Sequence, residues 1–80
     1  MDRVPGLGKR ISFYRQRAGL TKTALAREVG VDVSTVVKWE NEERQPETPG
    51  MLLRLARALG VTVSLLLGDS REGAPEAAPS

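Results

Sequence analysis

The sequence predicts an all-α fold in which five short helices pack around one hydrophobic core. Apolar residues recur at spacings of three and four along five separate segments, which is the periodicity of amphipathic helices. Glycines and threonines that suit helix ends lie between these segments. A chain of 80 residues has room for one small domain, which buries about 60% of its unfolded surface and is only marginally stable alone.

The first helix is expected to begin at Leu7 and to end at Gly19. One stripe of apolar side chains runs along this segment, at Leu7, Ile11, Tyr14 and Ala18. Phe13 falls off the stripe, so it either packs at the edge of the helix or contacts a partner. Residues 1–6 are expected to form a flexible lead-in, because they contain an adjacent proline and glycine.

The next two helices are expected at residues 22–29 and 33–40, joined by a tight turn at Gly30. Apolar side chains face one shared core, at Leu25, Ala26, Val29, Val36 and Trp39. Gly30 accepts the left-handed backbone of a short turn because it has no Cβ atom. Thr21 and Asp32 each precede a helix, where a side-chain oxygen can accept a hydrogen bond from the first turn. Two helices joined this closely form a helix-turn-helix, whose second helix lies in the DNA major groove.

The fourth helix is expected to open at Thr48 and Pro49 and to stop at Gly60. Threonine is a good cap, and proline suits the first helical position because its missing N–H has no partner there. The apolar stripe of this helix consists of Leu52, Leu55, Ala56 and Leu59.

A short fifth helix is expected at residues 63–67, with Thr62 as its cap. Three apolar side chains are expected to close the core, namely Val63, Leu66 and Leu67. Residues 69–80 are small, polar and rich in proline, which is typical of a disordered tail. The ordered domain is therefore expected at residues 7–68.

The composition argues against several classes of protein. The chain has no cysteine and no histidine, so the usual zinc ligands and the usual general base are missing. We therefore expect no metal site, no cofactor and no enzymatic activity. No run of about 18 apolar residues and no signal peptide is apparent, which favours a cytoplasmic protein without membrane contact. We also expect no second domain for a small-molecule effector.

The charge of the chain is small in total and uneven in distribution. The formal net charge is +2. Residues 1–38 hold eight basic and three acidic side chains, residues 39–68 hold three and four, and residues 69–80 hold one and three. The positive half contains both helices of the helix-turn-helix, as a surface that faces DNA phosphates requires.

The helix-turn-helix lies within a longer sequence pattern. Its segments are Leu20-Thr21-Lys22, Leu25-Ala26, Val29-Gly30-Val31, Ser34-Thr35-Val36 and Trp39-Glu40-Asn41. The pattern continues to Arg10 and Arg15 in the first helix and to Leu66 in the last. It resembles the Cro and phage-repressor (Xre-like) family of DNA-binding domains over about residues 7–68. The resemblance implies a compact five-helix phage-repressor-like fold with the helix-turn-helix at its second and third helices.

The resemblance also implies specific contacts. It implies an ion pair between Arg15 and Glu40 that ties the first helix to the end of the third. Where the family commonly has glycine after the third helix, this chain has Glu42. We expect Asn41 rather than Glu42 to take the left-handed backbone there, because asparagine tolerates it better. Leu65 stands where relatives are usually polar, so it is either a dimer contact or a leucine buried in the monomer.

Four residues of the third helix are expected to read DNA bases, namely Val33, Ser34, Val37 and Lys38. Lys38 can donate to guanine or to phosphate, Ser34 can bond to several bases, and the two valines can contact thymine methyl groups. The family more often has glutamine, arginine or serine at the valine positions. The alternatives are a solvated lysine and valines that are partly buried against neighbouring helices.

A second group of residues is expected to hold DNA phosphates, namely Lys22, Thr23, Thr35 and Asn41. Main-chain N–H groups at the start of the first motif helix supply further donors. Lys22 stands where the family usually has a glutamine that contacts the DNA backbone. Lysine keeps a donor at that position, and the alternative is a solvated side chain.

The sequence therefore predicts a sequence-specific, double-stranded-DNA-binding transcriptional regulator that acts as a homodimer on a palindromic operator. The resemblance implies repression or autoregulation. A second hypothesis is a protein-interaction module, such as an antitoxin or adaptor, which would account for the apolar residues Val33, Val37, Leu65 and Phe13. The two hypotheses differ in their response to salt, because binding driven by phosphates weakens steeply as salt rises.

Overall fold

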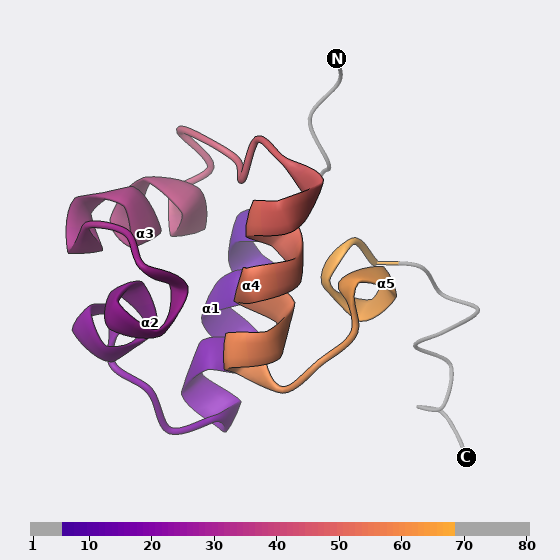
Figure 1. The fold of residues 1–80 in the computed structure, drawn as a ribbon, viewed down its shortest axis with the longest axis horizontal. Helices are drawn as coiled ribbons and strands as arrows, with labels where there is room; N and C mark the ends of the chain where they lie inside the picture. Colours follow the sequence, from indigo (N-terminus) through magenta and orange to yellow (C-terminus); the bar gives the residue numbers. More distant parts are fainter. Residues whose placement is uncertain (1–5, 69–80) are drawn as a thin grey trace.

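The computed structural model describes residues 6–68, which form five helices (Figure 1). The helices are α1 (Leu7–Arg17), α2 (Lys22–Val29), α3 (Val33–Glu40), α4 (Pro49–Leu59) and α5 (Val63–Leu66). No strand occurs within this range, and the predicted all-α fold is confirmed. Residues 1–5 of the expected lead-in and the expected tail, 69–80, lie outside the described residues. No described helix is long and apolar enough to cross a membrane.

The helices are arranged around the pair formed by α1 and α4. Figure 1 shows α4 lying across α1, with α2 and α3 on one side of this pair and α5 on the other. The helix-turn-helix of α2 and α3 has the bounds that its capping residues and apolar spacing predict. Since α3 contacts α1 and α2, and α2 contacts α4, the motif is packed onto the rest of the domain along one side only.

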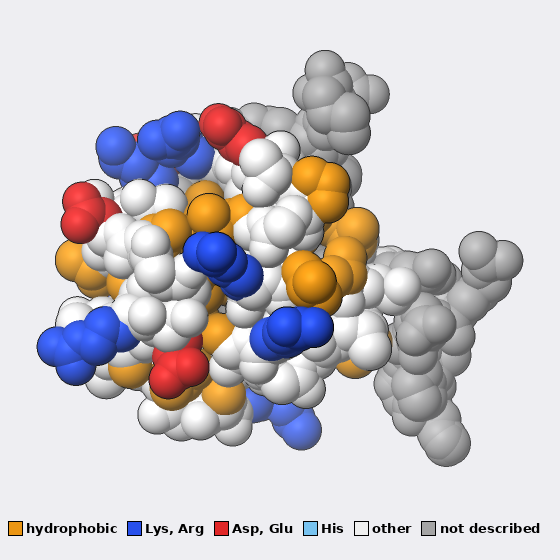
Figure 2. Space-filling view, viewed as in Figure 1, with side chains coloured by type: hydrophobic (Ala, Val, Ile, Leu, Met, Phe, Trp, Pro, Cys, Tyr) orange, Lys and Arg blue, Asp and Glu red, His pale blue; other side chains and the backbone are white. Residues whose placement is uncertain are grey.

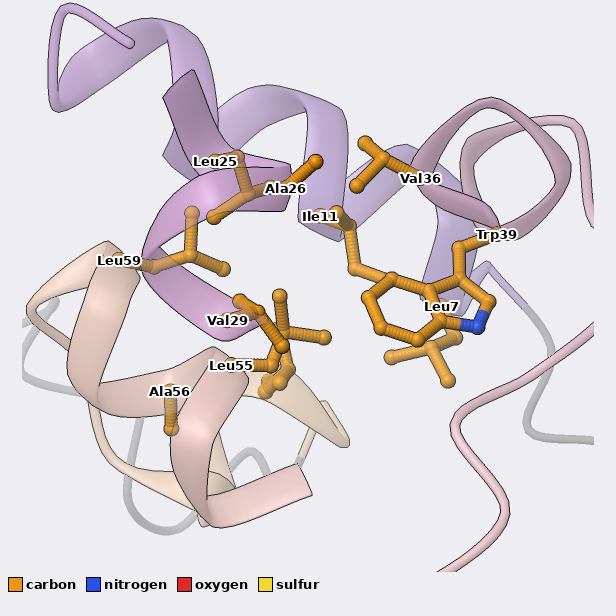
Figure 3. Close-up of a cluster of buried hydrophobic side chains, with 11 residues drawn as sticks. Leu7, Ile11, Leu25, Ala26, Val29, Val36, Trp39, Leu55, Ala56 and Leu59 are labelled. Carbon is orange, nitrogen blue, oxygen red and sulfur yellow. The ribbon is translucent and has the colours of Figure 1, made fainter. Parts of the chain in front are cut away.

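The core contains eleven buried hydrophobic residues from all five helices (Figure 3). They are Leu7, Ile11, Leu25, Ala26, Val29, Val36, Trp39, Leu55, Ala56, Leu59 and Leu66. Trp39 is only 4% exposed, and its ring lies beside Leu7 and Ile11, so it is a core residue and not a base-stacking one. Each fully buried leucine or isoleucine contributes about 1.5–3 kcal/mol to stability.

Threonine side chains cap three of the helices as expected. The hydroxyls of Thr21, Thr48 and Thr62 accept hydrogen bonds from first-turn N–H groups at 3.0, 3.1 and 3.0 Å. Asp32 occupies the corresponding position before α3, but its side chain accepts no capping hydrogen bond, so that expectation was wrong. The Asp32 carbonyl oxygen instead accepts from the N–H of Thr35 at 3.0 Å, which leaves the exposed carboxylate to solvent.

Two residues expected in the core are exposed. Ala18 lies one residue beyond the end of α1, and Leu67 lies one residue beyond the end of α5, where it is 36% exposed. In both places the helix ends earlier than its apolar pattern. Both residues keep a right-handed helical backbone, so their side chains still follow the apolar stripe, but the buried core does not extend that far.

The end of α3 differs from the expectation for Asn41. Asn41 keeps a right-handed backbone at φ −85°, and Glu42 takes the left-handed one at φ 62°. The N–H of Glu42 donates to the Trp39 carbonyl at 3.1 Å, and the N–H of Glu43 donates to the Lys38 carbonyl at 2.9 Å. These two bonds make a Schellman motif, which satisfies the last carbonyls of the helix.

A tertiary contact explains why a glutamate is held in this conformation. Its carboxylate oxygen Oε2 accepts a hydrogen bond from the main-chain N–H of Gly8 at 3.1 Å. This bond links the first turn of α1 to the residues that follow α3. It offsets the cost of a left-handed backbone, which is about 1–2 kcal/mol for a residue with a Cβ atom.

Gly8 allows the start of α1 to lie directly against the end of α3. A Cβ atom at this position would lie 2.6 Å from the carbonyl oxygens of both Trp39 and Glu40. Main-chain atoms cannot turn aside as a flexible side chain can. The close approach of the two helices therefore requires glycine at position 8.

Gly8→Ala is expected to lower the free energy of unfolding by about 1–3 kcal/mol, the usual cost of overpacking a tight contact. Gly50→Ala is the matched control, because a Cβ atom there meets nothing within 4 Å and the residue lies inside α4. That change is expected to stabilise the protein by about 0.5–1 kcal/mol. Urea unfolding followed by the fluorescence of the single tryptophan measures both. Equal effects of the two alanines would contradict the contact.

Candidate DNA-binding surface

The helix α3 presents one face to the core and the opposite face to solvent. Val36 and Trp39 are buried against the other helices. Ser34 and Lys38 are exposed, and Val33 is 43% exposed. Val37 is half-buried, so the expected alternative of partial burial describes it in the free protein. Three of the four expected base-reading side chains are thus freely accessible, and the fourth lies at the edge of the same face.

The four expected phosphate contacts do not all lie together. Lys22 and Asn41 line the same surface hollow, at the start of α2 and just after α3. Thr23 follows Lys22 and is exposed. Thr35 is half-buried and lines a different, smaller hollow beside Trp39, between α3 and the connection to α4. Lys22 and Asn41 thus lie together, Thr23 is exposed next to Lys22 in the sequence, and Thr35 lies apart from them.

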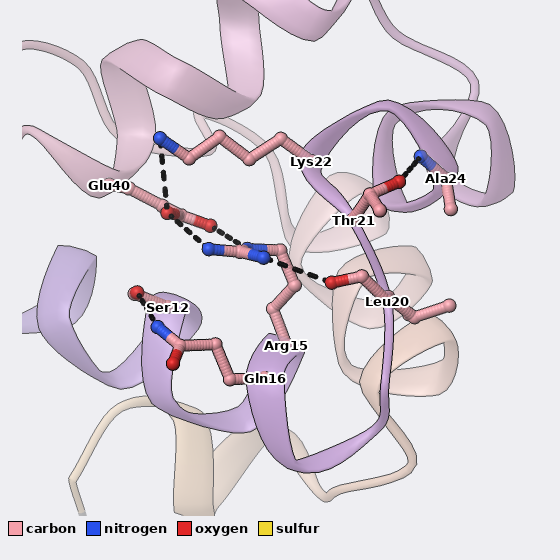
Figure 4. Close-up of polar contacts among 8 residues, drawn as sticks. All are labelled: Ser12, Arg15, Gln16, Leu20, Thr21, Lys22, Ala24 and Glu40. Carbon is pink, nitrogen blue, oxygen red and sulfur yellow. Dashed lines mark hydrogen bonds and ion pairs between the residues drawn. The ribbon is translucent and has the colours of Figure 1, made fainter.

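An ion pair between Arg15 and Glu40 holds α3 in place (Figure 4). Arg15 Nε donates to Glu40 Oε2 at 2.7 Å, and Arg15 Nη2 donates to Glu40 Oε1 at 3.3 Å. Arg15 Nη1 also donates to the carbonyl oxygen of Leu20 at 2.9 Å. The two side chains are only 12% and 6% exposed. One guanidinium group thus fixes the last turn of α1, the loop before α2 and the last residue of α3 relative to one another.

Lys22 lies on the outer side of this ion pair. Its Nζ atom is 4.0 Å from Glu40 Oε1, and its side chain is 43% exposed (Figure 4). A lysine at this distance is only weakly held, because surface pairs contribute about 0–1 kcal/mol. The ammonium group can therefore leave Glu40 for a phosphate oxygen without uncovering the carboxylate, which keeps Arg15.

Arg10 makes a contact that the sequence pattern did not specify. Its Nε atom donates to the carbonyl oxygen of Leu66 at 2.8 Å, which joins α1 to the end of α5. The family pattern marked Arg10 without indicating a partner. A contact between residues this far apart in sequence leaves no local signal that spacing could reveal.

Two apolar residues singled out in the sequence differ in burial. Leu65, the expected dimer contact, is half-buried in α5. Phe13 is 54% exposed, and its ring packs edge-on against Tyr14 at a centroid distance of 5.3 Å. Its contact is thus with its neighbour in the sequence, and more than half of the side chain stays exposed. No group of three potential metal ligands occurs among residues 6–68.

These features define a class of protein. An exposed helix is held rigidly at the end of a helix-turn-helix, next to polar donors at the start of the preceding helix. This arrangement is that of a helix-turn-helix DNA-binding domain. A helix-turn-helix family model matches residues 11–66. The chain therefore belongs to this family, in its Xre-like, phage-repressor type.

A curated relative of the chain is the HTH-type transcriptional regulator ImmR of Bacillus subtilis (strain 168). The two sequences are 34% identical over 62 residues, which are 78% of this chain and 48% of ImmR. The chain thus spans about half the length of this relative. ImmR is a transcriptional regulator, in agreement with the expectation that this chain has no enzymatic activity.

Three solved structures are similar to the domain. The DNA-binding domain of the P22 C2 repressor matches with a TM-score of 0.76 and 32% identity, over 85% of this chain and 90% of that one. SinR, the master regulator for biofilm formation, was solved in complex with DNA. It matches with a TM-score of 0.71 and 30% identity, over 76% of this chain and 97% of that one. The complex of the SinR and SinI proteins matches with a TM-score of 0.72 and 29% identity, over 82% of this chain and 64% of that one.

Replacing Arg15 tests the ion pair. Arg15→Met is expected to lower the free energy of unfolding by about 3–5 kcal/mol, because it leaves the nearly buried Glu40 carboxylate without its main partner. The double variant Arg15→Met/Glu40→Leu is expected to regain most of this loss, since no unpaired charge remains.

The matched control is Arg44→Met. Arg44 pairs with Glu47 at 3.3 Å, but the two side chains are 53% and 73% exposed. Arg44→Met is expected to lower the free energy of unfolding by at most about 1 kcal/mol. Chemical denaturation of the four proteins measures the differences. A cost for Arg15→Met no larger than that for Arg44→Met would contradict the structural role of the pair.

Proposed function

We propose that the chain is a transcriptional repressor or autoregulator that binds a pseudo-palindromic operator as a homodimer. The observation that carries the proposal is the free outer face of α3, with Ser34 and Lys38 exposed and the helix fixed by the Arg15–Glu40 pair. The similarity to the P22 C2 repressor domain and to SinR in complex with DNA supports the same reading. The cytoplasmic location expected from the sequence suits a ligand that is the cell's own DNA.

In this proposal α3 lies in the major groove and reads bases through its exposed face. Lys38 donates to guanine O6 and N7, Ser34 bonds to a neighbouring base, and Val33 contacts a thymine methyl group. Val37 adds an apolar contact at the edge of the face. Aliphatic side chains are suited to sites rich in A·T pairs, because only thymine offers a methyl group in the major groove.

The phosphates on either side of the groove are held by polar groups around α3. Lys22 and Asn41 form one such group, to which the exposed Thr23 adds a hydroxyl, and Thr35 contacts the other strand from its separate hollow. The first N–H groups of α2 add a partial positive charge at the start of that helix, where Lys22 also lies. These contacts set the position and orientation of the domain but carry no sequence information.

Dimerisation is proposed because one domain of this size makes too few contacts for tight specific binding. Two recognition helices about 34 Å apart along the duplex would each enter a major groove on the same side. Leu65 is proposed as part of the dimer contact. It lies in α5, which Figure 1 shows on the opposite side of α1 and α4 from the helix-turn-helix.

A second candidate function is a protein-interaction module on the same scaffold. It is favoured by large exposed apolar side chains, namely Phe13, Val33, Leu53 and Leu67. Figure 2 shows hydrophobic side chains gathered on the side of α4 that faces α5. The structure of SinR with SinI is a protein complex on a similar fold. Absence of binding to random duplex even at low salt would favour this candidate over DNA binding.

Substitutions of Lys38 and Lys22 test the division between base and phosphate contacts. Lys38→Ala is expected to weaken the free energy of binding to preferred duplexes by about 1–3 kcal/mol and to relax the sequence preference at one base pair. Lys22→Ala is expected to weaken binding to all duplexes alike, since a phosphate is present whatever the base. Affinities are measured on duplexes selected from a random pool and on unrelated duplexes. Equal losses on every sequence from both variants would refute the assignment.

Leu65→Gln tests the dimer contact. The family is usually polar at this position, so the monomer is expected to keep its fold, which a thermal melt verifies. Sedimentation equilibrium is expected to show weaker self-association. Binding to a two-half-site operator is expected to lose cooperativity, while affinity for one half-site stays the same. Unchanged self-association would remove Leu65 from the dimer surface without affecting the DNA-binding face.

A further inference from the structure

A surface hollow of about 800 Å³ lies between α1, the start of α2 and the end of α3. We propose that this hollow holds the sugar-phosphate backbone of the DNA strand beside the groove that α3 enters, with Lys9 and Arg17 of α1 as its phosphate donors. This inference rests on the proposed DNA binding and adds two residues to which the sequence pattern assigned no role.

The charges around the hollow favour an anionic ligand. Its lining includes four cationic side chains, namely Lys9, Arg15, Arg17 and Lys22, and one carboxylate, that of Glu40. The Glu40 carboxylate is matched by the bidentate contact with Arg15. Lys9 and Arg17 are exposed and form no ion pair within residues 6–68. Together with Lys22, they leave a local excess of three positive charges.

The shape and lining of the hollow fit a polymer backbone better than a small apolar molecule. Pockets of about 300–1,000 Å³ that bind small molecules are lined mostly by hydrophobic and aromatic groups. Here Phe13 is the one aromatic member of the lining, and the other side chains are polar or charged. The Ser12 hydroxyl and the Gln16 amide are joined by a hydrogen bond of 3.0 Å along one wall (Figure 4).

Phe13 holds Arg17 in a suitable position. The guanidinium carbon of Arg17 lies 5.5 Å from the centroid of the Phe13 ring. A cation–π contact of this kind contributes about 0.5–1 kcal/mol at an exposed site, and it forms no hydrogen bond with the ring. The five N–H donors at the edge of the group stay available for phosphate oxygens.

The position of the hollow agrees with the proposed DNA geometry. Lys22 and Asn41, two of the proposed phosphate contacts, form part of the same lining. The exposed face of α3 lies next to it, because Asn41 directly follows the last residue of that helix. A strand that leaves the α3 groove past Asn41 and Lys22 continues over α1, where it meets Lys9 and Arg17.

The experiment measures how the affinity of the 80-residue chain for duplex DNA depends on salt. The slope of log K against log [salt] is negative. Its magnitude falls by about 0.9 for each phosphate-binding cation that is removed. Lys9→Gln/Arg17→Gln is therefore expected to reduce the slope by roughly two and to weaken binding to every sequence alike. A thermal melt verifies that these exposed substitutions leave the fold intact.

Arg54→Gln/Arg57→Gln is the matched control. It removes the same charge from α4, beside a separate small hollow that Glu28 also lines. This pair is expected to leave the slope unchanged. Equal reductions from both pairs would overturn the inference, because total charge would then explain the effect.

Two further outcomes separate this inference from the proposed function. A normal slope for Lys9→Gln/Arg17→Gln, with a reduced slope for Lys22→Ala, overturns the role of α1 and leaves DNA binding in place. No binding of the unmodified chain to any duplex at low salt overturns the proposed function itself, and the inference with it.

Phe13→Leu tests how Arg17 is positioned. It is expected to weaken DNA binding in the unmodified chain and to have no effect in the Arg17→Gln variant, since the ring acts through the guanidinium group. Equal effects in both backgrounds would overturn that role for Phe13.

Discussion

The structure depends on one nearly buried ion pair, between Arg15 and Glu40. Its energetic value as a pair is modest, because two charges lose their hydration before they attract one another. Its geometric value is larger, because a planar guanidinium group contacts a carboxylate and the carbonyl oxygen of Leu20 in fixed directions. The last residue of α3 is therefore held at a set position relative to α1. A helix of eight residues needs such support to enter a groove in one orientation.

A second contact acts at the same end of α3. Gly8 brings the main chain of α1 against the carbonyl oxygens of Trp39 and Glu40, and its N–H donates to the carboxylate of Glu42. The ion pair and this contact both tie the end of α3 to α1, while the outer face of α3 carries none of the core. One face of α3 is thus fixed by packing, and the opposite face is accessible to solvent. The face that meets a ligand can vary in sequence without any change in the packing that supports it.

Much of the fold could be predicted from the sequence. The bounds of α2 and α3, the threonine caps and most core residues followed from spacing and from the chemistry of single residues. The failures occurred at helix ends, where one residue decides whether a side chain is inside or outside. Ala18 and Leu67 fall just past such ends, and Asp32 caps α3 without using its side chain. Periodicity describes the middle of a helix and says little about its final turn.

The sequence by itself determined which segments are helical, which faces are apolar and which family the chain resembles. All three depend on residues that lie close together in the sequence. Only the tertiary structure decided that Glu42 and not Asn41 takes the left-handed backbone, since the deciding partner is the N–H of Gly8, 34 residues away. It also decided that Lys9 and Arg17 share one hollow with Lys22. Contacts of this kind depend on how the helices cross, and side-chain shape and close main-chain approach set that crossing.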